Sequence, residues 1–375
     1  MSLQKSITPS QAKKLIEQHG YKVNSIEAIE GSISHIIFRI NKGEPHEAIV
    51  RFENTYIEDL KGRRKDFQYN SPLSLEREAN LCELVRKEAE LPAPEIKGLH
   101  YTEEGIGFLV VESLKGKHWR NFIKDNNYSL EKFLASLEYL GSDIAQAQRV
   151  RFNSYGNIMG RNWVEPEGVR NFIERVKTII DLKIERVKST EAFTQKEFNE
   201  VKKYFHDSLE ELLKMPVPKD HKPVLILTDI HPMNFLVDEK GKPSGYFDLE
   251  FCQAGAPVLE IYTLNSQLFA YFDKDTFHKA RNAFFKGFYN NGGVYEEGHP
   301  VNQRIEELLG LSGPLSGVAC YYGKDHDPIR RTWSKSFKEI LFDSITNKID
   351  PLTAYILIAD VLRIKTKQPK KPTLP

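Results

Sequence analysis

The sequence is poor in cysteine: its 375 residues include three, Cys82, Cys252 and Cys320, which lie far apart. An odd and widely spaced set predicts neither a disulfide framework nor the ligand spacing of a zinc site. The first residues, MSLQKSITPSQ, also lack the apolar segment of a secretory signal. Together these features favour a reducing compartment, and we expect a cytoplasmic protein.

The chain also lacks a charge excess and long apolar runs. Its 53 Lys and Arg residues balance 52 Asp and Glu residues, whereas nucleic-acid-binding proteins usually carry a basic excess. No apolar run reaches the ~18 residues that a membrane helix needs. We therefore expect no nucleic-acid partner and no membrane partner. The composition, 40% hydrophobic and 28% charged, is that of a globular protein. A chain of 375 residues is long enough for two lobes. We expect a monomer or a homodimer.

The N-terminal third is predicted to be rich in strands. Residues 8–19 have the capping and periodicity of a helix, with Thr8 as its cap. Short runs of β-branched and aromatic residues then predict strands within 25–31, 35–40, 47–52 and 105–114. Residues 75–90 have helical spacing behind the cap Ser74, and the polar stretch 53–73 is too long for an ordinary loop.

From Ser129 onward the apolar spacing is mostly helical and continues to about residue 365. One hairpin, within residues 224–251, interrupts these helices. The sequence therefore predicts an α+β chain with two lobes, a β-rich lobe over residues 1–112 and a helical lobe over 113–375. A polar tail that should fray follows the last helix.

The hairpin contains three oxygen-bearing side chains in a short space. Asp229 follows the apolar run VLIL, Asn234 begins the run NFLV, and Asp248 lies in YFDLEF, which we expect to form the return strand. Such a hairpin would return residue 248 to the neighbourhood of residue 234. Oxygen ligands without cysteine or clustered histidine suit Mg²⁺, although Asp and Asn also favour turns.

The order of these residues resembles that of the aminoglycoside phosphotransferase and choline kinase superfamily, small-molecule relatives of protein kinases. The matching stretches are LTDIHPMN and FDLE, where the family commonly has HGDLHPGN and a segment like IDFE. The resemblance covers about residues 20–265 and implies a bilobal protein-kinase-like fold. It implies that Asp229 is the catalytic base, and that Asn234 and Asp248 hold Mg²⁺ on the phosphates of ATP.

The resemblance extends to the β-rich lobe. Gly31 and Ser32, in GSISHIIFRI, would approach the nucleotide phosphates through their backbone N–H groups, although a plain turn fits them as well. Arg51, in EAIVRF, stands where the family usually has a phosphate-binding lysine, and Glu78 matches the helix glutamate that pairs with this cation. An arginine fork can bind phosphate at least as well as a lysine.

Further positions are also implied by the resemblance. Backbone groups from Glu112 to Leu114 would meet the adenine at the hinge between the lobes. His231 would order the catalytic turn, and Glu260 would replace a family aspartate of architectural role. The chain departs from the family at Leu227 and Thr228, which replace its usual His and Gly.

We therefore expect an ATP-dependent phosphotransferase that transfers the γ-phosphate to a hydroxyl of a small molecule. An antibiotic, an amino alcohol and a sugar all remain open as acceptors, because residues 260–375 show no acidic excess that would select polycationic antibiotics. One alternative is a choline- or ethanolamine-type kinase, with an aromatic cage for a quaternary ammonium. The other alternative is a nucleotide-binding pseudokinase without transfer activity.

Overall fold

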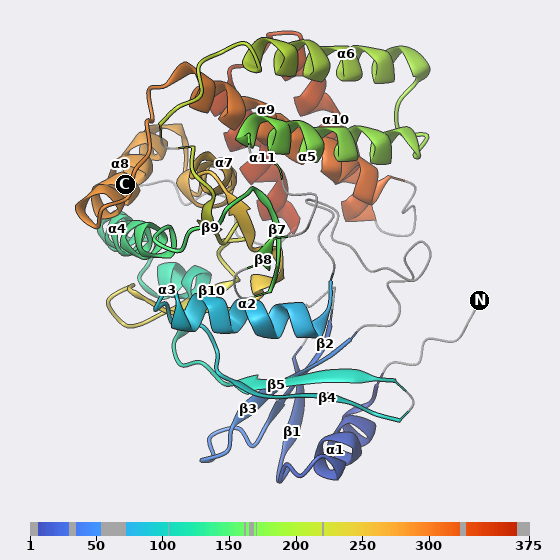
Figure 1. Ribbon diagram of the computed structural model, residues 1–375, viewed down its shortest axis with the longest axis vertical. Coiled ribbons are helices and arrows are strands. Elements are labelled where there is room, and N and C mark those ends of the chain that lie inside the picture. The colour runs from blue at the N-terminus through green and yellow to red at the C-terminus, as the bar shows by residue number, and fades with distance from the viewer. Residues whose placement is uncertain are drawn as a thin grey trace.

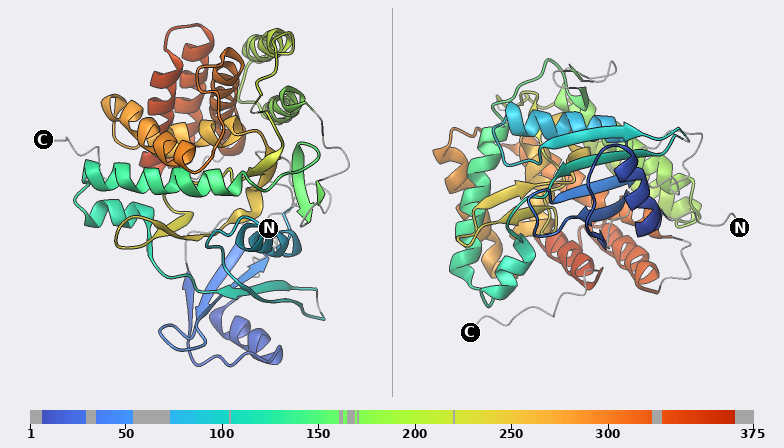
Figure 2. Two further views of the ribbon diagram at one scale, coloured as in Figure 1. Left: turned by 60° about the vertical axis from the view of Figure 1, so that its left-hand side comes forward. Right: turned by 90° about the horizontal axis from the view of Figure 1, so that it is seen from below.

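The computed structural model describes residues 7–29, 35–53, 73–103, 105–160, 163–164, 169, 171–219, 221–322 and 328–365. A small lobe built on one antiparallel sheet lies at one end of the molecule, and a larger, mostly helical lobe lies at the other (Figure 1). The left view of Figure 2 shows the same division from another side. The predicted α+β class with two lobes is confirmed.

The small lobe is an antiparallel sheet of five strands in the order β1-β2-β3-β5-β4. Its strands are β1 (Ile26–Ile29), β2 (His35–Ile40), β3 (Ala48–Glu53), β4 (Ile96–Tyr101) and β5 (Gly107–Glu112). The order places β3 at the centre, between β2 and β5, with Arg51 opposite Ile37 on one side and Leu109 on the other. Arg51 is therefore held by strand pairing on both sides.

Two helices accompany this sheet. Helix α1 (Pro9–Gln18) begins at the cap Thr8, whose side chain accepts from the N–H of Gln11 in a complete capping box, as predicted. Helix α2 (Leu75–Lys87) begins at Ser74, which accepts from the N–H of Arg77. Figure 1 shows α2 between the sheet and the large lobe, where it can contact both.

The apolar interior consists of separate clusters. One cluster joins α1 to the sheet and includes Ile16, Phe38 and Phe52. The largest cluster fills the helical lobe, and Leu81 and Val85 of α2 belong to it. The core of the large lobe therefore takes in part of a helix that precedes residue 112. The division of the chain at residue 112 stays a prediction.

Two small sheets lie where the lobes meet. One pairs β6 (Lys117–His118) with β10 (Phe235–Val237) and β10 with β11 (Pro243–Tyr246). The other has the order β8-β7-β12-β9, formed by β7 (Gly156–Gly160), β8 (Trp163–Val164), β9 (Val224–Ile226) and β12 (Gln253–Gly255). The hairpin that contains the candidate site thus belongs to both sheets and is anchored at each end.

The remaining helices form the large lobe. They are α3 (Trp119–Asp125), α4 (Leu130–Ala147), α5 (Phe172–Lys188), α6 (Gln195–Leu212), α7 (Val258–Leu264) with the π-helical turn η2 (Asn265–Phe269), α8 (Lys274–Asn290), α9 (Pro300–Tyr321), α10 (Pro328–Ile345) and α11 (Pro351–Lys365). The last helix ends where the sequence predicted, at residue 365. Among the described residues, no helix is long and apolar enough to cross a membrane.

Several strands were not predicted from the sequence. Strand β4 lies at the edge of its sheet, and most of its side chains are half-buried or exposed. Without a buried face, an edge strand needs no regular alternation of apolar and polar residues, and Gly98 and His100 interrupt the pattern. Strands β6, β7, β8 and β12 are two to five residues long, too short for periodicity to indicate them.

Helices α4 and α8 pack closely because each presents a glycine to the other. A methyl group at Gly141 of α4 would collide with the backbone carbonyl of Phe284, and one at Gly287 of α8 would collide with the carbonyl of Glu138. Backbone cannot move aside as a flexible side chain can. Close approach of the two helices therefore requires both glycines.

We predict that Gly141→Ala lowers the free energy of unfolding by about 1–3 kcal/mol or more, because overpacking usually costs this much. The matched control is Gly313→Ala in α9, where an added methyl group meets nothing within 4 Å. There the change should stabilise by up to about 1 kcal/mol through helix propensity. Urea unfolding of both variants measures the difference, and equal stabilities would contradict this account of the α4–α8 contact.

Candidate functional site

The turn after β9 brings Asp229 and Asn234 together. The side-chain amide nitrogen of Asn234 donates to the Asp229 carboxylate at 2.9 Å and to the Asp229 backbone carbonyl at 3.1 Å. Asn234 is buried and Asp229 is half-buried. Because the amide nitrogen is directed to Asp229, the amide oxygen of Asn234 is directed away from it and can act as a ligand.

A buried carboxylate fixes the backbone that follows β9. Glu260 of α7 is fully buried, and its two oxygens accept the backbone N–H groups of Leu227 at 2.8 Å and Thr228 at 3.1 Å. Burial raises the pKa of the Glu260 carboxyl to about 7, and the two N–H bonds oppose this rise. These contacts support the architectural interpretation of Glu260, since they fix the backbone immediately before Asp229.

Thr228 adopts a backbone conformation that favours glycine. Its φ is 62°, in the left-handed region, at the position where the resembling family has glycine. Its hydroxyl lies 2.7 Å from the carbonyl oxygen of Phe251, which ties the β9 end to the segment after Asp248. A β-branched residue in this region is strained, and the hydrogen bond of the Thr228 hydroxyl partly offsets that strain.

The start of α3 holds the other side of the same turn. The backbone N–H of Arg120 donates to the carbonyl of Pro232 at 3.1 Å. The ring nitrogen Nδ1 of His118 lies 3.1 Å from the carbonyl oxygen of Met233, so Nδ1 carries the proton. Burial lowers the pKa of His118, and the bond to Met233 opposes this change. Within the turn, Nδ1 of His231 accepts the N–H of Met233 at 3.1 Å, which agrees with the loop-ordering role expected for His231.

Asp248 is not on a strand, so that expectation was wrong. Strand β11 ends at Tyr246, and Asp248 has a left-handed φ of 61° before the short helical turn η1 (Leu249–Phe251). The alternation in YFDLEF looks like a strand, but aspartate tolerates the left-handed region and turns the chain here. The backbone N–H of Phe247 still donates to the carbonyl of Asn234, so residue 248 returns beside residue 234 as predicted.

The small lobe contributes a buried cation to Asp248. Nη2 of Arg51 lies 2.7 Å from Oδ1 of Asp248, and Nη1 forms an ion pair with Glu78 of α2. Burial works against the charge of Arg51, but the carboxylates of Glu78 and Asp248 hold the pKa of its guanidinium above the ordinary value. Burial raises the pKa of Glu78, and Arg51 opposes that rise. The pairing of Arg51 with Glu78 agrees with the sequence prediction.

This cation retains an unused donor. Among the described residues, Nε of Arg51 is buried and has no hydrogen-bond partner, and the same holds for Oε2 of Glu78. A buried donor without a partner costs free energy, so Nε of Arg51 is a donor that a bound acceptor group would satisfy.

Arg77, the neighbour of Glu78 on α2, was not singled out from the sequence. Its guanidinium donates to the carbonyl oxygens of Ile158 at 2.7 Å, Cys252 at 3.0 Å and Glu250. Arg77 is 3% exposed, so these contacts lie inside the molecule. Helix α2 therefore binds the segment after Asp248 through Arg77, and it binds Arg51 through Glu78.

The remaining predicted positions either lie near the junction of the lobes or fall outside the described residues. Glu112 ends β5, and its backbone N–H donates to the carbonyl of Glu95. Leu114 packs on β11, where a methyl group at Gly245 would come within 2.8 Å of it. Their contact with adenine stays a prediction. Gly31 and Ser32, the stretch 54–72 and the polar tail lie outside the described residues.

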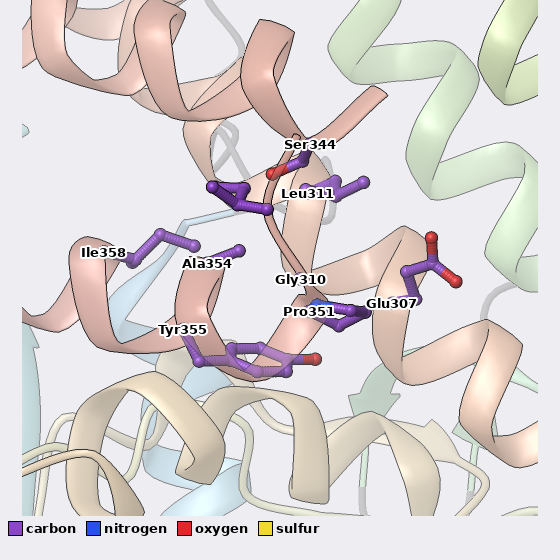
Figure 3. A pocket seen from close by; sticks show the side chains of 9 residues that line it. Glu307, Gly310, Leu311, Ser344, Pro351, Ala354, Tyr355 and Ile358 are labelled. Atoms are coloured by element: carbon purple, nitrogen blue, oxygen red, sulfur yellow. The ribbon is translucent and has the colours of Figure 1, made fainter. Parts of the chain in front are cut away.

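A small hollow elsewhere in the large lobe is separate from this chemistry. Its lining includes Gly310 of α9, Ser344 of α10, and Pro351 and Tyr355 of α11 (Figure 3). Its volume is about 10 Å³, the space of one water molecule, and none of the predicted site residues lines it. It gives no support to a substrate site.

The comparisons with known proteins agree with this geometry. The sequence pattern of the phosphotransferase enzyme family matches residues 25–298, which is well over half of the chain. The chain belongs to this family. It is accordingly a small-molecule phosphotransferase, as the sequence predicted. No curated protein sequence matches it.

Solved structures show the same phosphotransferase fold at low sequence identity. An aminoglycoside phosphotransferase in complex with GDP and kanamycin is 13% identical, with a TM-score of 0.58, over 91% of this chain and 100% of the other. A putative fructosamine-3-kinase from Thermobifida fusca is 16% identical, with a TM-score of 0.58, over 93% and 99%. A second aminoglycoside phosphotransferase, bound to AMP-PNP and hygromycin B, is 13% identical, with a TM-score of 0.58, over 89% and 97%.

We predict that Thr228→Gly is neutral or stabilising, whereas Thr228→Ala destabilises. Both changes remove a hydroxyl bond of about 1 kcal/mol, but only glycine also relieves roughly 1–2 kcal/mol of left-handed strain. The two variants should therefore differ by about 1–2 kcal/mol in the free energy of unfolding. Denaturant unfolding measures this difference, and an alanine variant as stable as the glycine variant would refute the strain.

A second prediction concerns the buried support of β11. The Tyr246 hydroxyl donates to Asp143 of α4 at 2.8 Å, and burial raises the pKa of Asp143 to about 6. The folded state thus keeps a proton that the unfolded chain loses, so stability falls as the pH rises through this range. Relative to Asp143→Asn, the wild type should lose about 2 kcal/mol between pH 4.5 and 7.5. Parallel pH dependences of the two free energies of unfolding would contradict this.

Proposed function

We propose that this phosphotransferase transfers the γ-phosphoryl group of ATP to a hydroxyl group of a small molecule. The observation that supports this most directly is the meeting of two sets of residues. Arg51 and Glu78 from the small lobe reach Asp248, while Asn234 joins Asp229 on the adjoining turn. A cation for phosphate, two oxygen ligands for a metal and a carboxylate base are the parts that phosphoryl transfer requires.

Arg51 is proposed to bind the nucleotide phosphates. Its Nε has no partner among the described residues, and a phosphate oxygen is an acceptor that would take this bond. Its Nη1 stays on Glu78, which keeps the guanidinium in place. Because the fork offers donors in one plane, Arg51 can hold Glu78 and a phosphate together in a way that a lysine point charge cannot.

The residues around Asp248 also suit Mg²⁺. The donor set of the Asn234 amide oxygen and the Asp248 carboxylate is oxygen only, which is what this ion prefers. The bound ion would neutralise charge that develops on the phosphates. Asn234 keeps its amide oxygen turned away from Asp229, and Asp248 places a carboxylate two residues after the end of β11, in a left-handed turn.

Asp229 is proposed to accept the proton of the acceptor hydroxyl. Its carboxylate is oriented by Asn234, and its backbone is fixed by the contacts of Glu260 just before it. A half-buried carboxylate on a rigid turn is suited to position a hydroxyl for attack. The acceptor class remains open within this proposal, and the structural neighbours crystallised with kanamycin and hygromycin B make amino sugars the first group to test.

Two substitutions test this assignment. Asp229→Asn should leave binding of Mg·ATP nearly unchanged and lower turnover by roughly 10²–10⁴-fold, the usual contribution of a general base. Asp248→Ala should weaken the Mg²⁺-dependent binding of ATP, and not only turnover. Release of ADP with a panel of kanamycin, hygromycin B, fructosyl amines, macrolides, choline, ethanolamine and sugars, together with calorimetry of nucleotide binding, measures both effects.

The control is Glu239→Gln, which removes one exposed carboxylate from the loop of the same hairpin. It should change neither binding nor turnover. Normal turnover in Asp229→Asn would disprove the base assignment, and unchanged Mg²⁺-dependent binding in Asp248→Ala would disprove the metal assignment. Binding of Mg·ATP without turnover on any acceptor would favour the pseudokinase alternative.

A further inference from the structure

His35 lies against the Arg51–Glu78 pair, although no role was predicted for it from the sequence. It is the first residue of β2, pairs with Glu53 of β3 and is 6% exposed. Its ring nitrogen Nδ1 lies 3.1 Å from Nη2 of Arg51, the same nitrogen that contacts Asp248. Its other nitrogen, Nε2, lies 3.7 Å from Oε2 of Glu78.

These contacts determine the proton position on the ring. A guanidinium nitrogen only donates, so Nδ1 of His35 must accept, and the proton of the neutral ring is on Nε2. That N–H faces Oε2 of Glu78, an oxygen without a hydrogen-bond partner among the described residues. The ring therefore presents an acceptor to the arginine and a donor to the glutamate, matching the polarity of each.

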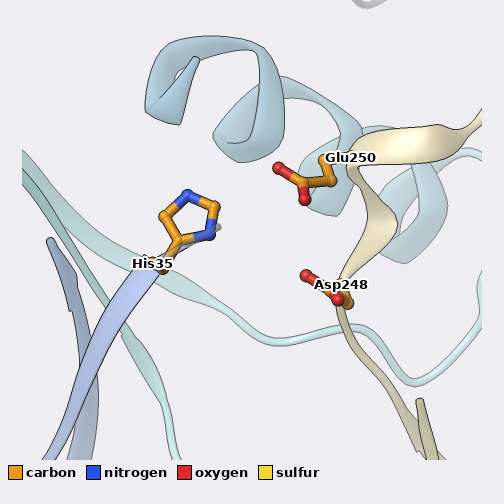
Figure 4. A group of neighbouring side chains, drawn as sticks. All are labelled: His35, Asp248 and Glu250. Carbon is orange, nitrogen blue, oxygen red and sulfur yellow. The ribbon is translucent and has the colours of Figure 1, made fainter. Parts of the chain in front are cut away.

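The surroundings of His35 could also be taken for a metal site. Ligand atoms of His35, Asp248 and Glu250 lie within 4.8 Å of one another, and Figure 4 shows the two carboxylates on one segment facing the imidazole. However, Nη2 of Arg51 lies within hydrogen-bond distance of both His35 and Asp248. A cationic nitrogen thus already contacts two of the three groups, so we interpret the cluster as a setting for the arginine.

We infer that His35 is a positioning residue that fixes the rotation of the Arg51 guanidinium. The inference rests on the proposed phosphate-binding role of Arg51. Glu78 holds Nη1, and His35 and Asp248 hold Nη2, so the plane of the fork is set and Nε keeps one direction. If Asp248 were to bind a metal ion in place of Arg51, His35 would still hold Nη2.

The test is a double-mutant cycle on the affinity for AMP-PNP with Mg²⁺, measured by calorimetry. His35→Phe keeps the ring and removes both nitrogens, and it should weaken binding about tenfold, the value of one hydrogen bond to a charged group. In an Arg51→Lys background the same change should cost less than about threefold, because an ammonium has no fork to orient. His35→Asn places an oxygen acceptor near the position of Nδ1 and should restore most of the affinity.

A probe without phosphates separates positioning from simple structural damage. Adenosine should bind wild type and His35→Phe equally, since Arg51 is proposed to meet only the phosphates. Equal losses of AMP-PNP affinity in both Arg51 backgrounds, a parallel loss for adenosine, or no loss at all would each overturn the inference. If the wild type binds no AMP-PNP, or the neutral variant Arg51→Gln binds it as wild type does, the proposed role of Arg51 fails as well. A silent His35→Phe beside a weakened Arg51→Gln removes only the role of His35.

Discussion

The buried charge of Arg51 is the constraint around which the two lobes are arranged. Arg51 is 6% exposed, and its charge must be paired because an unpaired buried charge is far more costly than any single contact that it could make. Its carboxylate partners come from α2 and from the turn after β11, which are 27 and 197 residues away along the chain. The sheet, α2 and the hairpin that contains Asp248 must therefore be placed together before this charge is satisfied.

The sequence was informative where its signals were local. Asp229, Asn234 and Asp248 lie within 20 residues, so a hairpin alone was enough to predict that they meet. The cap of α1 and the start of α2 were also predicted, since each depends on a side chain and an N–H group three residues away. Arg51 and Glu78 were found only through the resemblance, because nothing in EAIVRF or LEREANL by itself distinguishes them from surface charges.

The features that were missed depend on contacts across the fold. Arg77 looks like an ordinary helix residue, yet its partners are carbonyl groups at positions 158, 250 and 252. His35 is one polar residue at the start of an apolar strand, and only the assembled sheet places it against Arg51. The left-handed turn at Asp248 was also missed, because an alternating pattern predicts a strand regardless of how the chain must bend to reach α2.

Helix α2 belongs to both lobes at once, and this limits how the chain can be divided. A fragment that ends at the hinge would keep Arg77 but lose the three carbonyl groups that it binds, and it would keep Arg51 without Asp248. The complementary fragment would lack Leu81 and Val85 from its own core. Because the two fragments complete each other's contacts through α2, we expect neither to fold alone, and a version of this protein expressed in two parts would fold only as its halves associate.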